Sequence, residues 1–351
     1  MHFSLDKKEA QKLESLFAQH EKNLDYLIYV RSVLIDSPIV LEAPEKTKNE
    51  YEIKCDYFDK LSKLYPFPNA FVKDNILWDT VLIDIKHLKA NPYLQAIDNI
   101  SFDVDGWSIK KIRRPGYTLV PYQEEYNFGS NYTLKMSLAL INDDYLYPSI
   151  RLYDQEWMSL NQHEIRTMET PIAIAKGKVL TLGLGLGYFA YMVDYKDEVN
   201  EVHVVEMDLE LINLFNKYLL PLFPHPEKVH IHKADAYYFI QNIKDGEYNF
   251  IFSDLWQDVG DGLASYLKLK KVFNKFTKTT CSYWIEEAIV SYLRLLVIGV
   301  MKNEYYHLKN DDDEIQTLIK EKLKDYRISS STDIDALLCL KGLNESLINN
   351  D

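Results

Sequence analysis

Three glycines stand at alternating positions in the segment VLTLGLGLGYF, residues 179–189. The chain holds only 12 glycines in 351 residues, and glycine loses much conformational freedom in an ordered element. We therefore expect Gly183, Gly185 and Gly187 to serve an unusual backbone conformation or a ligand that touches bare backbone. The loop follows the apolar run 178–182 and precedes a helical pattern. This context turns backbone N–H groups and a helix N-terminus toward a ligand.

Acidic residues stand at the ends of the apolar runs that follow the glycine loop. Glu206 ends the next run, 19 residues after Gly187, and a carboxylate there can accept hydrogen bonds from both hydroxyls of a ribose. A dinucleotide site would need G-x-G-x-x-G/A. Tyr188 occupies the place of the third small residue, where it would obstruct helix–strand packing. NAD and FAD are therefore disfavoured as ligands.

Four segments together resemble the class I S-adenosylmethionine-dependent methyltransferase superfamily, and within it the spermidine-synthase-like branch. Their order and spacing are more specific than any one of them. The residues before the first segment, from about 150 onward, also resemble the approach to the site in these families. The four segments are VLTLGLGLGYFAYMV (179–193), EVHVVEMDLELINLF (201–215), KADAYYFI (233–240) and YNFIFSDLW (248–256).

The resemblance implies a role for each matching residue. The three glycines would leave room for the amino acid and ribose parts of S-adenosylmethionine, which is the expected cofactor. Glu206 would bind the ribose hydroxyls. Asp235 would accept a hydrogen bond from the adenine amino group, and Ala236 would supply a backbone N–H. Asp235 and Asp208 also suit helix N-caps; for Asp208 we favour the cap.

The chemistry is expected in SDLWQDVGDG, residues 253–262. Methyl transfer is an in-line displacement, so the protein must align the nucleophile and remove its proton where needed. Asp254 and Asp258 are the predicted catalytic residues. Trp256 is assigned to the substrate pocket, where it could stack on a cation. Glu164 is also assigned to the substrate side, although a capping-box glutamate is the alternative.

The primary prediction is a methyltransferase that acts on a small-molecule or peptide acceptor. The adenine-modifying signature [DNS]-PP-[YFW] is absent from Ser253-Asp254-Leu255-Trp256. Many methyltransferases carry an acidic residue where this chain has Thr181. The first alternative is an aminopropyltransferase that uses decarboxylated S-adenosylmethionine, although polyamine synthases typically have a Gly-Pro after their catalytic aspartate and a Gly-Gly-x-x-Gly loop. The second alternative is a non-catalytic scaffold that retains the fold.

No metal site is predicted. Asp254, Asp258 and Asp261 have oxygen ligands for a divalent ion, but no second half of such a site is visible. His203, His230 and His232 lie on strands expected to be neighbours, and alternate residues share a strand face. Without a cysteine or a carboxylate in the pattern, we treat them as ordinary strand residues. The basic run 110–114 is expected at a solvated hairpin end.

The elements that position these residues alternate as strand and helix, which is typical of a doubly wound, mostly parallel sheet. The fold class is α/β: a Rossmann-like methyltransferase fold with a helical N-terminal region and a small antiparallel β unit. One helix is expected from Asn69 to Asn91, and the sheet is expected to lack its final antiparallel hairpin. The expected divisions are 1–99 (helical), 100–160 (β unit), 161–305 (S-adenosylmethionine-binding domain) and 306–351 (helical tail).

The amino-acid composition limits the classes of binding partner that we expect. The net charge is −13, from 53 acidic and 40 basic side chains, so nucleic acid is a poor expected partner. A small-molecule or peptide substrate is expected, with a cationic one favoured by the charge, and a homodimer stays open. Three separated cysteines argue for a reducing compartment. The N-terminus lacks a signal-peptide core, and the apolar run 288–300 is short and carries Arg294. A cytoplasmic protein without a membrane span is predicted.

Overall fold

Five parallel strands form the sheet that carries the candidate site. We analysed a computed structural model, which describes residues 1–35, 40, 42, 48–78, 80–127, 133–309 and 311–348. The strand order is β11-β10-β9-β12-β13, and every neighbouring pair is parallel. The bounds are β9 Gly177–Leu182, β10 Val199–Glu206, β11 Val229–Lys233, β12 Phe250–Ser253 and β13 Thr280–Tyr283.

These strands form because short apolar runs can be buried on both faces of a parallel sheet. Val179, Val204 and Ile251 are completely buried. In the described residues this sheet has no strand beyond β13, which agrees with the expected loss of the final hairpin. The protein therefore has an α/β, Rossmann-like fold, as predicted.

Helices connect the strands and pack in groups. Helix α7 contacts both α5 and α6, and α9 contacts α10. Helix α6 begins at the side-chain cap of Asn161 and continues through Pro171. The bounds are α5 Pro92–Ala96, α6 Gln162–Ile174, α7 Tyr188–Asp194, α8 Leu209–Leu214, α9 Ala236–Asn242 and α10 Val259–Phe273.

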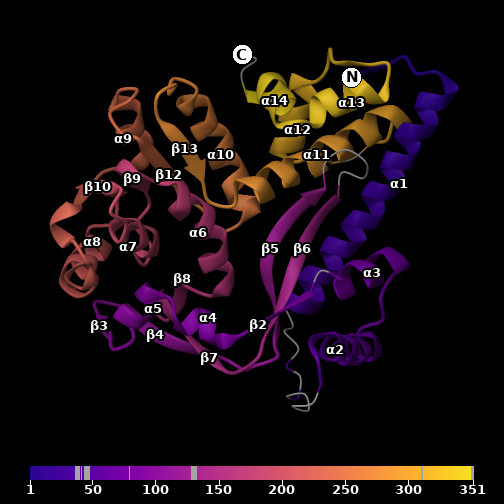
Figure 1. Cartoon of the computed structure of the whole chain (residues 1–351). Coiled ribbons are helices and arrows are strands. Elements are labelled where there is room, and N and C mark those ends of the chain that lie inside the picture. Colours follow the sequence, from indigo (N-terminus) through magenta and orange to yellow (C-terminus); the bar gives the residue numbers. More distant parts are fainter. Residues whose placement is uncertain are drawn as a thin grey trace.

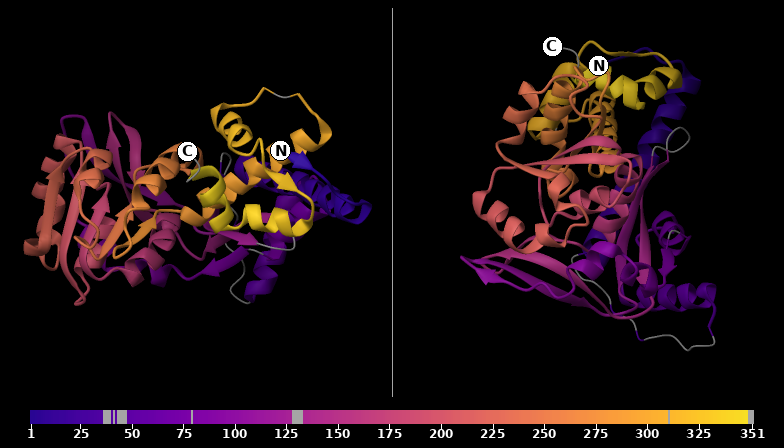
Figure 2. Two further views of the ribbon diagram at one scale, coloured as in Figure 1. Left: turned by 90° about the horizontal axis from the view of Figure 1, so that it is seen from above. Right: turned by 60° about the vertical axis from the view of Figure 1, so that its left-hand side comes forward.

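A second β region lies below and to the right of the parallel sheet in the view of Figure 1. It comprises an antiparallel sheet, β3-β4-β7-β8, and a three-stranded sheet, β2-β6-β5. Two views in Figure 2 show the long strands of this region from other sides. The bounds are β2 Thr80–Ile83, β3 Asp103–Val104, β4 Trp107–Arg114, β5 Leu119–Asn127, β6 Thr133–Ile141, β7 Tyr145–Leu152 and β8 Gln155–Ser159.

The prediction of one helix from Asn69 to Asn91 is wrong. Helix α3 (Ala70–Trp78) is followed by strand β2 and then by the short helix α4 (Ile85–Lys89). Strand β2 pairs in parallel with β6, with Val81 opposite Ala139. This long-range pairing overrides the helical spacing of the apolar residues.

The first elements of the chain pack against elements near its C-terminal end (Figure 1). Strand β1 pairs with β14, with His2 opposite Arg327. Helix α1 contacts both α11 and α13. None of the described helices combines the length and apolar character that a membrane crossing requires. The remaining bounds are β1 His2–Phe3, α1 Lys7–Tyr29, α2 Glu50–Leu64, α11 Glu286–Tyr306, α12 Glu314–Lys322, β14 Arg327–Ile328, α13 Ser331–Leu338 and α14 Leu340–Leu343.

Candidate active site

A cavity of about 820 Å³ lies at the carboxyl ends of the parallel strands. This edge of an open α/β sheet is where ligands usually bind. Most of the residues predicted from the sequence meet here, although they come from different elements. The predicted residues that line the cavity are Glu164, Gly183, Gly185, Glu206, Asp235, Ala236, Asp254 and Trp256.

The glycine loop adopts a backbone that other residues rarely adopt. Gly183, Gly185 and Gly187 have φ values of 97°, 51° and 76°. A Cβ on Gly183 would lie 2.1 Å from the carbonyl oxygen of Asp254, and one on Gly187 would lie 2.6 Å from the ring of Phe215. Both left-handed φ and close contacts therefore require glycine. Gly187 caps helix α7 and is outside the described cavity lining.

Two N–H groups of this loop are bonded inside the protein. The Leu184 N–H donates to Glu206 Oε2 at 3.2 Å. The Leu186 N–H donates to the Met158 sulfur at 3.3 Å. These two groups are therefore not free to bind an anionic ligand, contrary to the expectation for this loop. A Cβ on Gly185 would lie 2.4 Å from the same sulfur.

Glu206 is the last residue of β10, and backbone hydrogen bonds fix its carboxylate. Its Oε1 accepts from the N–H groups of Met207 at 2.7 Å and Asp208 at 2.9 Å. Together with Leu184, three backbone donors orient the side chain at the cavity wall. Such a fixed acceptor suits hydroxyl donors of a ligand.

Asp235 follows strand β11 and caps helix α9. Its Oδ1 accepts from the Tyr238 N–H at 2.8 Å, and the residue lines the cavity. Asp208 caps α8 through the Leu211 N–H at 2.9 Å, which confirms the predicted cap. Because a carboxylate has two oxygens, capping leaves Asp235 an acceptor for a ligand.

Asp254 follows β12 and faces the cavity. Its backbone N–H donates to Leu182 O at 2.9 Å, which fixes the position of the residue. Burial raises the pKa of the Asp254 carboxyl to about 7. A carboxyl group with this pKa can take up and release a proton near neutral pH. Perturbed carboxyls in clefts are candidates for acid–base chemistry.

Asp258 has a different position from Asp254. It caps helix α10, where its Oδ1 accepts from the N–H groups of Gly260 at 2.7 Å and Asp261 at 3.2 Å. The Asp258 N–H donates back to Asp261 Oδ1 at 2.9 Å, which completes a capping box. Among the described residues, Asp261 lines the cavity and Asp258 does not.

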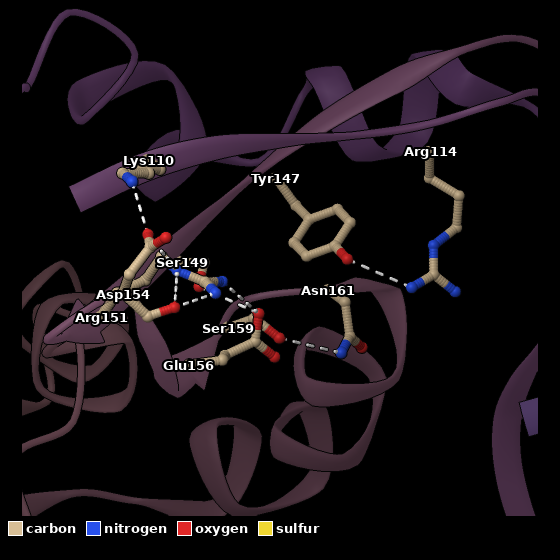
Figure 3. Close-up of polar contacts among 9 residues, drawn as sticks. All are labelled: Lys110, Arg114, Tyr147, Ser149, Arg151, Asp154, Glu156, Ser159 and Asn161. Carbon is tan, nitrogen blue, oxygen red and sulfur yellow. Dashed lines mark hydrogen bonds and ion pairs between the residues drawn. The ribbon is translucent and has the colours of Figure 1, made fainter. Parts of the chain in front are cut away.

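Strand β8 supplies another part of the wall (Figure 3). Glu156 Oε2 accepts from Ser149 Oγ at 3.0 Å and lies 3.6 Å from Arg151 Nη1. Asn161 Nδ2 donates to Ser159 Oγ at 3.4 Å (Figure 3). Arg151 therefore partly neutralises the charge of the Glu156 carboxylate.

The basic run 110–114 lies along β4 and not at a hairpin end. Lys110 pairs with Asp154 at 2.6 Å, and Lys111 pairs with Asp98 at 2.6 Å. Arg114 Nη2 donates to Tyr147 Oη at 3.1 Å (Figure 3). These contacts give the run a structural role at the surface of the sheet.

Several cavity residues were absent from the prediction. Trp157 and Met158 come from β8, and Trp284 follows β13. Trp284 Nε1 donates to Thr167 Oγ1 at 2.9 Å, which joins the end of β13 to α6. Trp284 directly follows β13, and residues that follow parallel strands commonly contact ligands in such sheets; this position is the signal that could have identified it.

Part of the chain matches a known protein family. Residues 163–306, about two fifths of the sequence, match the family described as "Spermine/spermidine synthase domain". No curated protein matches the sequence. The match includes all five strands of the parallel sheet, and the other regions of the chain lie outside the matched residues.

Solved structures similar to the chain include three described as spermidine synthases. One is in complex with the transition-state analogue AdoDATO (14% identity, TM-score 0.32, 52% of this chain, 54% of that chain). One is from Thermotoga maritima (15% identity, TM-score 0.31, 50% of this chain, 71% of that chain). A probable spermidine synthase is from Corynebacterium glutamicum (12% identity, TM-score 0.33, 58% of this chain, 70% of that chain). The match thus spans about half the length of the first structure.

The domain match corrects the predicted activity. Spermidine synthases are aminopropyltransferases whose substrate is decarboxylated S-adenosylmethionine. The assignments of a methyltransferase and of S-adenosylmethionine as cofactor are therefore wrong, whereas a transferase with a Rossmann-like fold remains consistent. The shared fold explains the error, because the two classes have similar nucleoside cradles and differ in the group that is transferred.

Proposed function

We propose that the protein is an aminopropyltransferase that uses decarboxylated S-adenosylmethionine and an aliphatic amine acceptor. The observation that carries this proposal is the charge of the cavity. Its described lining contains no lysine or arginine. The acidic residues of the lining are Glu156, Glu164, Glu206, Asp208, Asp235, Asp254 and Asp261.

This charge distribution favours the decarboxylated donor over S-adenosylmethionine. The carboxylate of S-adenosylmethionine would find no cationic side chain in the described lining and would approach several carboxylates. Loss of that carboxylate leaves a ligand with a sulfonium and an ammonium cation. Opposite charges within a few ångströms attract, and more strongly where water is excluded.

The positions of three cavity residues support roles in binding decarboxylated S-adenosylmethionine, the aminopropyl donor. Glu206 would accept hydrogen bonds from the ribose hydroxyls, since three backbone N–H groups already fix its carboxylate. Asp235 would accept from the adenine amino group with the oxygen that does not cap α9. Ala236 lines the same part of the cavity and would donate its backbone N–H.

The reaction requires one nucleophile and one proton acceptor. The lone pair of the acceptor nitrogen forms a bond to the propyl carbon attached to sulfur. The carbon–sulfur bond breaks, and its electron pair stays on sulfur, which becomes a neutral thioether. The nitrogen loses one proton, which Asp254 would accept; its pKa of about 7 suits this role.

The acceptor is proposed to be a diamine or polyamine. Glu164 and Asp261 line the cavity together with Trp256 and Trp284. Carboxylates bind ammonium groups, and aromatic faces attract cations and pack on methylene chains. The combination suits a flexible molecule with positive charges separated by apolar carbon.

A product assay tests the proposal. The full chain is incubated with decarboxylated S-adenosylmethionine and putrescine, and mass spectrometry follows the amine and the thioether. We expect both products at equal amounts, and a loss of at least about 100-fold in Asp254→Asn with donor binding retained. Glu227→Gln, at an exposed site, is the control and should keep wild-type turnover. Donor binding without turnover for any amine would favour a non-catalytic scaffold.

A further inference from the structure

A cluster of histidines lies on the parallel sheet away from the cavity lining. Glu201 and His203 are alternate residues of β10, so they share one face of the strand. His230 lies directly opposite His203 on the neighbouring strand β11, and the two rings are 4.8 Å apart. The sheet thus brings two imidazoles and a carboxylate together.

We propose that Glu201, His203 and His230 form a binding site for a transition-metal ion, with Zn²⁺ as the best fit. One ligand atom from each residue lies within 4.8 Å of the other two. Two nitrogen ligands and one oxygen ligand suit Zn²⁺. Water would complete a tetrahedral shell, because the His230 side chain is exposed and the Glu201 side chain is partly exposed to solvent.

Small side-chain movements can bring the three ligand atoms to bonding distance from one ion. Bonds of about 2.0–2.2 Å in a tetrahedron place ligand atoms about 3.4 Å apart. His203 Nε2 and Glu201 Oε2 are 2.9 Å apart, so this pair must open slightly. His230 must approach by roughly 1 Å, given those bond lengths. Its exposed side chain permits that rotation.

A third histidine orients the buried ligand. His203 Nδ1 lies 2.8 Å from His232 Nε2. When the metal occupies His203 Nε2, the proton resides on Nδ1 and is donated to His232. A metal-bound histidine usually donates its other N–H in this way, which fixes the ring.

One cation competes with the proposed ion. Lys178 Nζ forms an ion pair with Glu201 Oε2 at 3.0 Å. Metal binding would displace the lysine, so removing that charge should strengthen binding.

Calorimetric titration of the EDTA-treated full chain with Zn²⁺ tests the site. We expect one equivalent to bind with a Kd of about 1 µM or tighter, and Mg²⁺, which prefers oxygen ligands, not to compete. His230→Gln and Glu201→Gln should each weaken binding at least tenfold, while Lys178→Met should strengthen it. His225→Gln is the matched control, because His225 lies 3.7 Å from Glu227 and outside the cluster.

Spectroscopy adds a readout that does not depend on affinity. Co²⁺ in place of Zn²⁺ should give the intense visible bands of a tetrahedral ion in wild type and lose them in His230→Gln. Circular dichroism establishes that each variant is folded. Absence of saturable Zn²⁺ binding to wild type, or equal binding to wild type and both cluster variants, would overturn the proposal. Neither result would affect the proposed aminopropyl transfer, because the cluster shares no residue with the cavity lining.

Discussion

Gly183 and Asp254 are in direct backbone contact at the junction of β9 and β12: a Cβ on Gly183 would lie 2.1 Å from the Asp254 carbonyl oxygen. The Asp254 N–H also donates to Leu182 O, the residue before this glycine. The backbone of the glycine loop and that of Asp254, the proposed proton acceptor, therefore hold each other in position. A change in one is expected to displace the other.

Gly183→Ala should destabilise the protein more than Gly185→Ala. At Gly183 the new methyl group meets backbone, which cannot rotate away, whereas at Gly185 it meets the end of the flexible Met158 side chain. Both positions also have positive φ. We expect a loss of at least about 2 kcal/mol in the free energy of unfolding for Gly183→Ala and roughly half of that for Gly185→Ala. Urea denaturation measures both, and equal losses would contradict the contact.

The pH dependence of turnover should report Asp254. Its carboxyl must be ionised to accept a proton, and burial raises its pKa to about 7. We expect kcat/KM to rise with pH up to about 7 and then to level off, and this inflection to be absent in Asp254→Asn. A rate that continued to climb well above that pH would indicate that only deprotonation of the amine in solution limits the reaction.

Asp254→Asn should also change stability in a pH-dependent way. The folded state binds the Asp254 proton more tightly than the unfolded chain, so wild-type stability falls as pH rises from about 4 to about 7. The neutral amide avoids this loss. We expect the variant to gain about 1–3 kcal/mol in unfolding free energy at pH 8, and the gain to vanish near pH 4.

Asp258→Asn is the matched control for this measurement. Asn also caps helices well, and the Asp258 side chain is committed to Gly260 and Asp261. Its unfolding free energy should stay within about 0.5 kcal/mol of wild type at each pH. A similar gain in both variants would mean that net charge, and not burial of Asp254, is responsible.

Glu206→Gln should weaken donor binding and leave the acceptor chemistry intact. The amide keeps one oxygen acceptor, but its NH₂ group cannot accept from the Leu184, Met207 or Asp208 N–H groups. We expect at least a tenfold rise in the donor Kd and a loss of about 1–2 kcal/mol in stability. Calorimetry and urea denaturation measure the two effects. An unchanged donor Kd would exclude Glu206 from the ribose site.

The Rossmann-like unit could be predicted because its evidence is local. The apolar runs, the glycine loop and the acidic residues that end each strand all appear in sequence order, and a parallel sheet brings its strand ends together. This rule placed Glu206, Asp235 and Asp254 at one cavity. It could not place Met158, which reaches the loop from β8 in a different sheet.

One other error has a specific physical cause. The helix expected across Val81 fails because β2 pairs with β6, a contact between distant segments that spacing alone does not reveal. The proposed metal site was not expected from the sequence, although Glu201 precedes His203 by two residues and thus shares its strand face. The period of the strand contained that signal, but the pairing of His203 with His230 depended on the sheet register.

The most direct test of the central claim is the donor preference of the cavity. Calorimetric competition between decarboxylated S-adenosylmethionine and S-adenosylmethionine on the full chain isolates the effect of one carboxylate. Because the described lining has seven acidic residues and no basic one, we expect the decarboxylated donor to bind at least about tenfold tighter, a difference of about 1.4 kcal/mol. Equal affinity, or tighter binding of S-adenosylmethionine, would contradict the account.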